Sequence, residues 1–117
     1  MRKKVYHLGT CSTCVQILKK LNPGPDVELQ DIKTQQMTEA QVDEMQRLAG
    51  SYEALFSRIA LKYRSMGLNE MKLTEKEYRK YILQEYTFLK RPVIIVNDKI
   101  FIGNSPKNVE AAKKALH

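Results

Sequence analysis

The sequence contains no tryptophan, only two cysteines among its 117 residues, and no block of five like charges. No apolar run approaches the roughly 18 residues of a membrane-spanning helix. The basic residues Arg2, Lys3 and Lys4 are followed by strand-like residues and a polar helix, not by the apolar core of a signal peptide. We therefore expect one cytoplasmic domain over residues 1–117, in which thiols stay reduced.

The formal net charge is +7, but basic and acidic residues are interleaved along the whole chain. This distribution favours a mostly solvated surface, with part of the excess facing an anionic small molecule. It predicts neither direct nucleic-acid binding nor membrane binding.

Apolar periodicity and turn residues predict the order of the elements. Residues 4–8 and 27–32 are expected as strands joined by a helix over 12–21, and the two strands should therefore be parallel. Residues 93–96 and 99–102 form a hairpin around Asn97-Asp98, before a last helix capped by Ser105 with Pro106 at its first position. The sequence thus predicts an α/β protein with a mixed four-stranded sheet, a thioredoxin-like arrangement.

Between the two strand-rich ends, residues from about 38 to 89 are expected as a helical insertion. Thr38 with Gln41 and Thr74 with Glu77 have the spacing of capping boxes. An apolar period from Tyr52 through Leu55 and Phe56 to Ile59 predicts a further helical piece.

The two cysteines occur as Cys11-Ser12-Thr13-Cys14, between the first strand and the first helix. Cys11 at the helix N-terminus should have a lowered pKa, because unpaired N–H groups and the helix dipole favour the thiolate. Cys14 is one turn further along the same face, where it can close a disulfide with Cys11. Cys11 is thus expected to be the more exposed nucleophile, and no metal is expected.

Less reactive interpretations stay open for the same residues. A zinc site would need two further ligands, and only His7 and His117 remain. The two cysteines could also form a purely structural disulfide, or stay as inert buried thiols. His7 is expected as a strand side chain, although it could serve as a base toward the thiol.

The strand–CxxC–helix pattern, the segment from Gly50 to Arg58, and Leu89-Lys90-Arg91-Pro92-Val93-Ile94-Ile95 together resemble the arsenate reductase (ArsC)/Spx family over nearly the full chain. The resemblance implies that Cys11 is the nucleophile and that Arg58 and Arg91 hold an oxyanion. It also implies that Pro92 is a cis proline beside the active-site sulfur.

Glutathione-coupled arsenate reductases share a third arginine after the last hairpin, where this sequence has Asn104. We expect Ser12, Thr13, Pro92 and Asn104 to contribute to substrate binding, with Cys11, Cys14, Arg58 and Arg91 as the catalytic set. The resemblance thus implies a thiol oxidoreductase that reduces arsenate, with glutathione and glutaredoxin or an intramolecular thiol as reductant and no tightly bound cofactor.

The second cysteine of the CxxC is more similar to the Spx branch. There, the pair acts as a redox switch and the protein binds the RNA polymerase α subunit. A redox-switched regulator is therefore the main competing hypothesis, and a disulfide oxidoreductase of glutaredoxin type is a third.

Overall fold

The computed structural model describes residues 2–117. Its strands are β1 (Lys3–His7), β2 (Glu28–Asp31), β3 (Val93–Val96) and β4 (Lys99–Ile102). Its α-helices are α1 (Ser12–Leu21), α2 (Glu39–Ala49), α3 (Leu61–Ser65), α4 (Glu75–Gln84) and α5 (Pro106–Leu116). Short 3₁₀ helices are η1 (Glu53–Leu55), η2 (Leu68–Glu70) and η3 (Tyr86–Phe88).

The chain divides into two compact units. The first consists of the residues up to 36 together with residues 91–117, and it contains the sheet with α1 and α5. The second consists of residues 37–90, which include every other helix. Each unit is held together by its own set of contacts.

The sheet of the first unit has the strand order β2-β1-β3-β4. Strands β1 and β2 are parallel, with Val5 opposite Leu29, because α1 carries the chain back to the same end of the sheet. Strands β3 and β4 are antiparallel and turn at Asn97, whose φ of 57° lies in the left-handed region that asparagine tolerates. Strand β1 also pairs antiparallel with β3. The expected mixed four-stranded sheet is confirmed.

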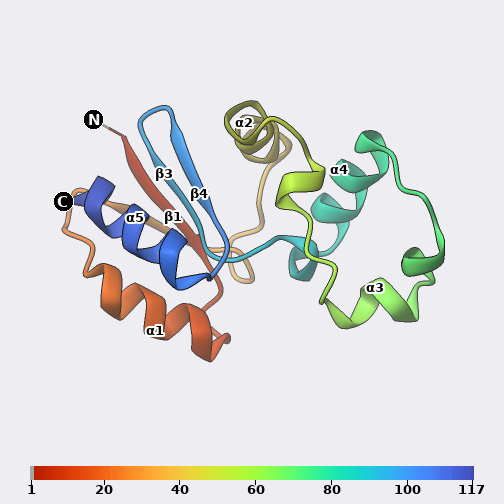
Figure 1. Ribbon diagram of the computed structural model, residues 1–117, viewed down its shortest axis with the longest axis horizontal. Helices are drawn as coiled ribbons and strands as arrows, with labels where there is room; N and C mark the ends of the chain where they lie inside the picture. The colour runs from red at the N-terminus through yellow and green to blue at the C-terminus, as the bar shows by residue number, and fades with distance from the viewer. Residues whose placement is uncertain (1) are drawn as a thin grey trace. The chain divides into compact units, whose positions relative to one another are not determined.

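Helices α1 and α5 lie side by side and share one apolar core with the sheet (Figure 1). Helix α1 contributes Ile17 and Leu21, while Lys19 and Lys20 of the same helix stay exposed. The core consists of Val5, Ile17, Leu21, Val27, Ile94, Val96, Val109, Ala112 and Leu116. This packing fixes α1, and therefore its N-terminus, against the end of β1.

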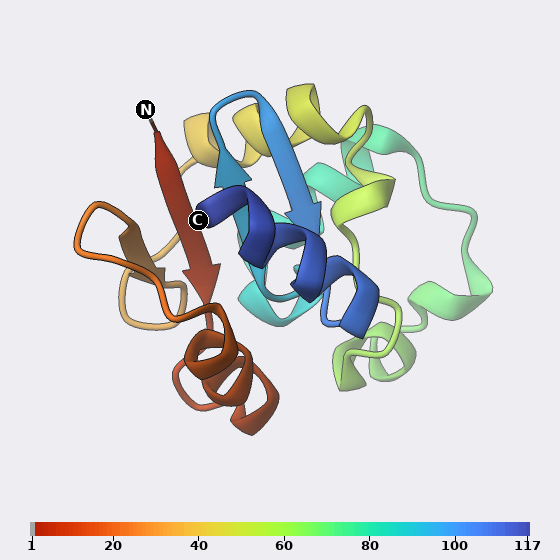
Figure 2. The same ribbon diagram turned by 60° about the vertical axis from the view of Figure 1, so that its left-hand side comes forward.

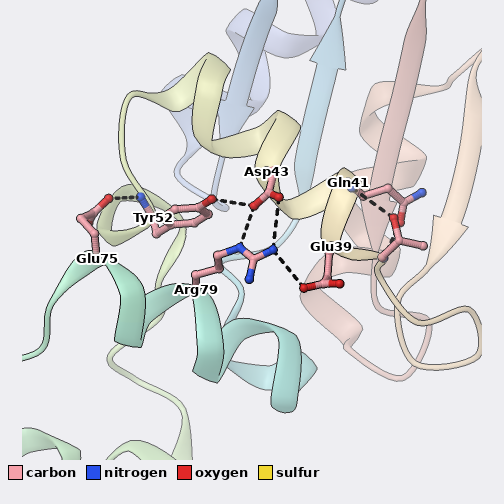
Figure 3. A network of polar contacts seen from close by, with 7 residues as sticks. Glu39, Gln41, Asp43, Tyr52, Glu75 and Arg79 are labelled. Carbon is pink, nitrogen blue, oxygen red and sulfur yellow. Dashed lines mark hydrogen bonds and ion pairs between the residues drawn. The ribbon is translucent and has the colours of Figure 1, made fainter.

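The second unit contains both expected capping boxes, at Thr38 with Gln41 and at Thr74 with Glu77. Figure 3 shows how Arg79 of α4 reaches Asp43 and Glu39 of α2, while the Tyr52 hydroxyl donates to the same Asp43 carboxylate. These polar contacts join α2 and α4 on the surface of the unit.

The helical piece expected through Tyr52 to Ile59 is wrong beyond Leu55. Only the short η1 forms, and Phe56 then pairs as an isolated antiparallel bridge with Leu89. Ile59 is 90% exposed and contributes nothing to the core. The apolar residues of the segment therefore do not share one helix face, because Phe56 pairs with Leu89 whereas Ile59 points to solvent.

No helix within residues 2–117 has both the length and the hydropathy needed to cross a membrane.

Candidate active site

Cys11 is the N-cap residue of α1, with φ −95° and ψ 115°. Its backbone N–H donates to the Leu8 carbonyl at 3.0 Å, and its carbonyl accepts the first helical hydrogen bond from the Val15 N–H, also at 3.0 Å. The turn after β1 therefore ends with the Cys11 side chain at the positive end of the helix dipole. Cys11 is half-buried and Cys14 is only 2% exposed.

The surroundings of Cys11 lower the pKa of its thiol. The backbone N–H of Cys14 has the largest effect, and the N–H of Thr13 adds to it. The Cys11 side chain makes no capping hydrogen bond of ordinary length, so these N–H groups act as nearby dipoles that favour negative charge on the sulfur. Partial burial opposes the shift, and the side chain of Cys14 and the charge of Arg91 support it.

The pKa of Cys14 is shifted the opposite way. Burial raises it, and the neighbouring Cys11 raises it further, both through its charge and through the hydrogen bond between the two side chains. Cys14 therefore stays protonated when Cys11 ionises, and its S–H can donate to the Cys11 thiolate. Both thiols are free in the structure.

The pairing of the strands brings Arg91 and Pro92 to the same end of the sheet as the CxxC. Val93, the first residue of β3, lies opposite Tyr6 on one side and Ile102 on the other. The segments next to these residues, including the loop that leads from β1 to Cys11, therefore gather at one edge. The positive charge of the Arg91 guanidinium lowers the pKa of both cysteine thiols.

The Arg91-Pro92 peptide bond is cis, as the resemblance implied. Pro92 is buried, and its carbonyl accepts a hydrogen bond from the Gly103 N–H at 2.9 Å. This contact sets the exposed residue Asn104 beside the proline loop. Asn104 also borders a groove of about 250 Å³ between α1 and α5, together with Ile17 and Lys20.

Ser12 and Thr13 form the exposed first turn of α1. Thr13 acts on Cys11 through its backbone N–H. Cys11, Cys14, Ser12, Thr13, Arg91, Pro92 and Asn104 all belong to the first unit.

Arg58 belongs to the second unit, where it follows the Phe56 bridge. Its guanidinium forms an ion pair with Glu53 at 2.7 Å and donates to the Tyr78 hydroxyl at 2.9 Å. These contacts hold one face of the guanidinium while its side chain stays 44% exposed. Neither partner was expected from the sequence. Nothing in the spacing of Glu53 or Tyr78 to Arg58 pointed to them, because the contact with Tyr78 spans 20 residues.

The sequence also raised a metal site and His7 as alternatives for this region. Among the residues that the structure describes, no group of three or more His, Cys, Asp or Glu side chains could hold a metal ion. His7 pairs with Asp31 in the sheet register, as a strand residue, and its Nδ1 atom is buried without a hydrogen-bond partner.

Comparisons with known proteins show the family and the fold of the chain. The model of the ArsC family matches residues 6–112. An arsenate reductase from Haemophilus influenzae is 28% identical over 115 residues, which cover 90% of this chain and 93% of that protein.

Two solved structures are similar over almost the whole chain. An arsenate reductase from Vibrio cholerae has a TM-score of 0.79 at 17% identity, with 96% of this chain and 98% of that one covered. An arsenate reductase related protein from Brucella melitensis has a TM-score of 0.72 at 22% identity, with 95% and 93% covered. At these identities the structures show a shared fold.

Proposed function

We propose that this chain, which belongs to the ArsC family and has its thioredoxin-like fold, is an oxidoreductase that reduces arsenate through Cys11. The observation that carries the proposal is the lowered pKa of Cys11 at the α1 N-terminus, with the positive charge of Arg91 nearby. A thiolate at neutral pH is the form that attacks an electrophilic centre.

The proposed reaction needs two thiols. The Cys11 thiolate displaces a hydroxide or water from arsenate, forming a sulfur–arsenic bond. A second thiolate then attacks the Cys11 sulfur, a disulfide forms, and the electron pair of the broken bond stays on arsenic. Arsenic(V) becomes arsenic(III), two thiols become one disulfide, and one water is released overall.

Arg91 is proposed to hold the arsenate oxygens, because a guanidinium can donate two parallel hydrogen bonds to an oxyanion. The backbone N–H groups at Ser12 and Thr13 offer further donors at the helix N-terminus. Asn104 can donate one neutral hydrogen bond where related enzymes have a charged arginine. Arg58, which pairs with Glu53 in the structure, enters the proposal through the resemblance alone.

The second thiol is either Cys14 or glutathione. The buried, protonated Cys14 hydrogen-bonds to Cys11, so the two sulfurs are close enough to compete with an external thiol. With Cys14 as the resolving thiol, one turnover leaves a Cys11–Cys14 disulfide. With glutathione, it leaves a mixed disulfide on Cys11 and a free Cys14, which glutaredoxin would then reduce.

Turnover of arsenate with glutathione, glutaredoxin and an NADPH-linked recycling system tests the proposal. Arsenite should accumulate with the wild-type protein, and Cys11→Ser should abolish its formation. Arg91→Gln should raise the KM for arsenate because a charged donor is lost. The matched substitution Lys99→Gln, in the β4 strand, should leave the kinetics unchanged. A wild-type protein that produces no arsenite with any of these thiols would contradict the proposal.

A redox-switched regulator of Spx type is the second candidate. It is favoured by the close Cys11–Cys14 pair and by the neutral Asn104 in place of an arginine. In that case oxidation of the pair would alter binding of the RNA polymerase α subunit. Binding of the purified α subunit should then differ between reduced and oxidised protein, and Cys14→Ala should remove the difference. Identical binding in both states would contradict the redox-switch hypothesis.

A further inference from the structure

The groove of about 250 Å³ between α1 and α5, here called the α1–α5 groove, lies entirely within the first unit. Ile17 of α1 and Val109 of α5 form its floor, and both are almost fully buried. Pro106 and the exposed residue Asn104 line it where α5 begins. Apart from Asn104, no lining residue enters the proposed reaction, so most of this groove has no role in the chemistry at Cys11.

The two ends of the α1–α5 groove differ. Helices α1 and α5 run side by side in the same direction in Figure 1, and α5 lies in front of the sheet in Figure 2. The helices also end together, since His117 Nε2 lies 2.8 Å from the Leu21 carbonyl oxygen. Lys20 and Lys113, which belong to the last turns of α1 and α5, therefore line the same end. Asn104 lies at the other end, at least about 10 Å away by the rise of α5.

Three charged side chains border this groove, namely those of Lys20, Lys113 and Glu110, and all three are exposed. None of them forms an ion pair with another residue between 2 and 117, whereas Lys3 and Lys4 of the same unit are paired with carboxylates at 2.9 and 2.7 Å. Two ammonium groups and one carboxylate leave a net charge of +1 at the groove, which complements a ligand with a single negative charge.

An inorganic dianion and a protein segment fit this groove less well. The apolar floor offers no hydrogen bonds to a small hydrated anion, and the Glu110 carboxylate repels a second negative charge. The volume is just below the range of about 300–1,000 Å³ that is typical of small-molecule pockets. A small organic molecule with an apolar body and one anionic end is therefore the occupant that size and charge favour.

We propose that the α1–α5 groove binds a small organic carboxylate with an apolar chain about 10 Å long. The carboxylate accepts hydrogen bonds from the ammonium groups of Lys20 and Lys113, and the chain lies over Ile17 and Val109 toward Asn104. This site is distinct from the proposed reaction, because binding there involves no covalent step and neither cysteine lines the groove.

A titration of the full chain with sodium octanoate, followed by ¹H–¹⁵N NMR in the absence of arsenate, tests the site. Octanoate should cause saturable shifts of the backbone amide signals of Ile17, Lys20, Val109 and Lys113. Acetate lacks the chain and octanamide lacks the charge, so each should bind at least about tenfold more weakly than octanoate.

Two double variants separate a local site from a general effect of charge. Lys20→Gln combined with Lys113→Gln should raise the Kd for octanoate at least about tenfold, because both ammonium donors are lost. Lys19→Gln combined with Lys114→Gln removes the same charge from the same two helices but outside the groove, and should leave the Kd within about twofold. All four side chains are exposed, and the NMR spectra themselves show that the variants fold.

Glu110→Gln gives an opposite expectation. It removes the one negative charge that borders the groove, so it should lower the Kd for octanoate about threefold. A raised or unchanged Kd in this variant would contradict the charge argument.

Four further results would overturn the inference and leave the proposed chemistry at Cys11 unaffected. One is an equal Kd for octanoate in the two lysine double variants. Another is a set of shifts confined to other apolar surfaces, such as that of Leu29 on β2. A third is displacement of octanoate by an equal concentration of sulfate or arsenate, which would indicate an inorganic anion site. The fourth is a short peptide with a free carboxyl-terminal leucine that binds at least about tenfold more tightly than octanoate, which would assign the groove to a protein terminus.

Discussion

Replacing Asp43 by Asn should destabilise the second unit, because Asp43 is the common acceptor of the network in Figure 3. The Arg79 guanidinium donates to both carboxylate oxygens, at 2.8 and 3.2 Å, and the Tyr52 hydroxyl donates at 2.6 Å. These hydrogen bonds, first that of Arg79 and then that of Tyr52, lower the pKa of Asp43 to about 2.

The size of the effect follows from that shift. Lowering the pKa from 3.8 to about 2 corresponds to roughly 2.4 kcal/mol for a fully shielded group, at 1.36 kcal/mol per pKa unit. The Asp43 side chain is 36% exposed, so solvent screening reduces the contribution to about 1 kcal/mol. For a domain of this size, that loss lowers Tm by roughly 4 °C.

The pH dependence gives the sign of the prediction. Because the pKa of Asp43 is lower in the folded protein, its contribution is present above the unfolded value of 3.8 and is lost as pH falls toward about 2. Urea denaturation of the wild type and of Asp43→Asn should therefore differ at pH 7 and converge near pH 2. Glu110→Gln, an exposed carboxylate of α5, is the matched control and should change little. A difference that is the same at both pH values would refute the electrostatic explanation.

Three further changes have expected outcomes. Glu28→Gln should lower the free energy of unfolding in urea by about 1–2 kcal/mol, because it leaves the charge of Lys4, which is 6% exposed and pairs with Glu28 at 2.7 Å, buried without its partner. Lys4→Met should lower it less, since no buried charge remains. Equal losses of unfolding free energy in the two variants would argue against this explanation. Cys14→Ala should raise the pKa of Cys11 and slow the alkylation of Cys11 near neutral pH. Cys14→Ser keeps a hydrogen-bond donor, so it should raise the pKa of Cys11 by a smaller amount. Faster alkylation of the alanine variant would contradict this expectation. Gly103→Ala should lower the free energy of unfolding by about 1–2 kcal/mol, because φ at this residue is +96°, a conformation that alanine adopts only with strain. A Cβ atom would meet no other atom there, so an unchanged Tm would contradict the backbone argument.

Local signals identified most of the elements. Capping boxes at Thr38 and Thr74, Pro106 at the start of α5 and the alternation between strands and helices each correspond to a short-range physical rule, and the structure confirms them. The parallel pairing of β1 with β2 and the antiparallel pairing of β3 with β4 followed because a helical crossover makes strands parallel and a two-residue turn makes them antiparallel.

Such short-range rules do not predict contacts between residues far apart in the sequence. The bridge between Phe56 and Leu89 ended the expected helix, although the apolar spacing up to Ile59 looked helical. Similarly, the hydrogen-bond partners of Arg58 are Glu53 and Tyr78, the latter on α4, and only folding of the unit brings both of them to the Arg58 side chain. At the CxxC, the sequence predicted the lowered pKa from the helix dipole, but not that the Cys14 backbone N–H would be its largest cause.

The most direct measurement is the rate of alkylation of Cys11 as a function of pH, made on Cys14→Ser so that only one thiol reacts. The proposed function predicts a midpoint below the value of about 8.5 for a free thiol, an upward shift of that midpoint in Arg91→Gln, and protection by arsenate. A midpoint at or above the free-thiol value, unaffected by Arg91 and by arsenate, would show that Cys11 is not held ionised and would contradict the central claim.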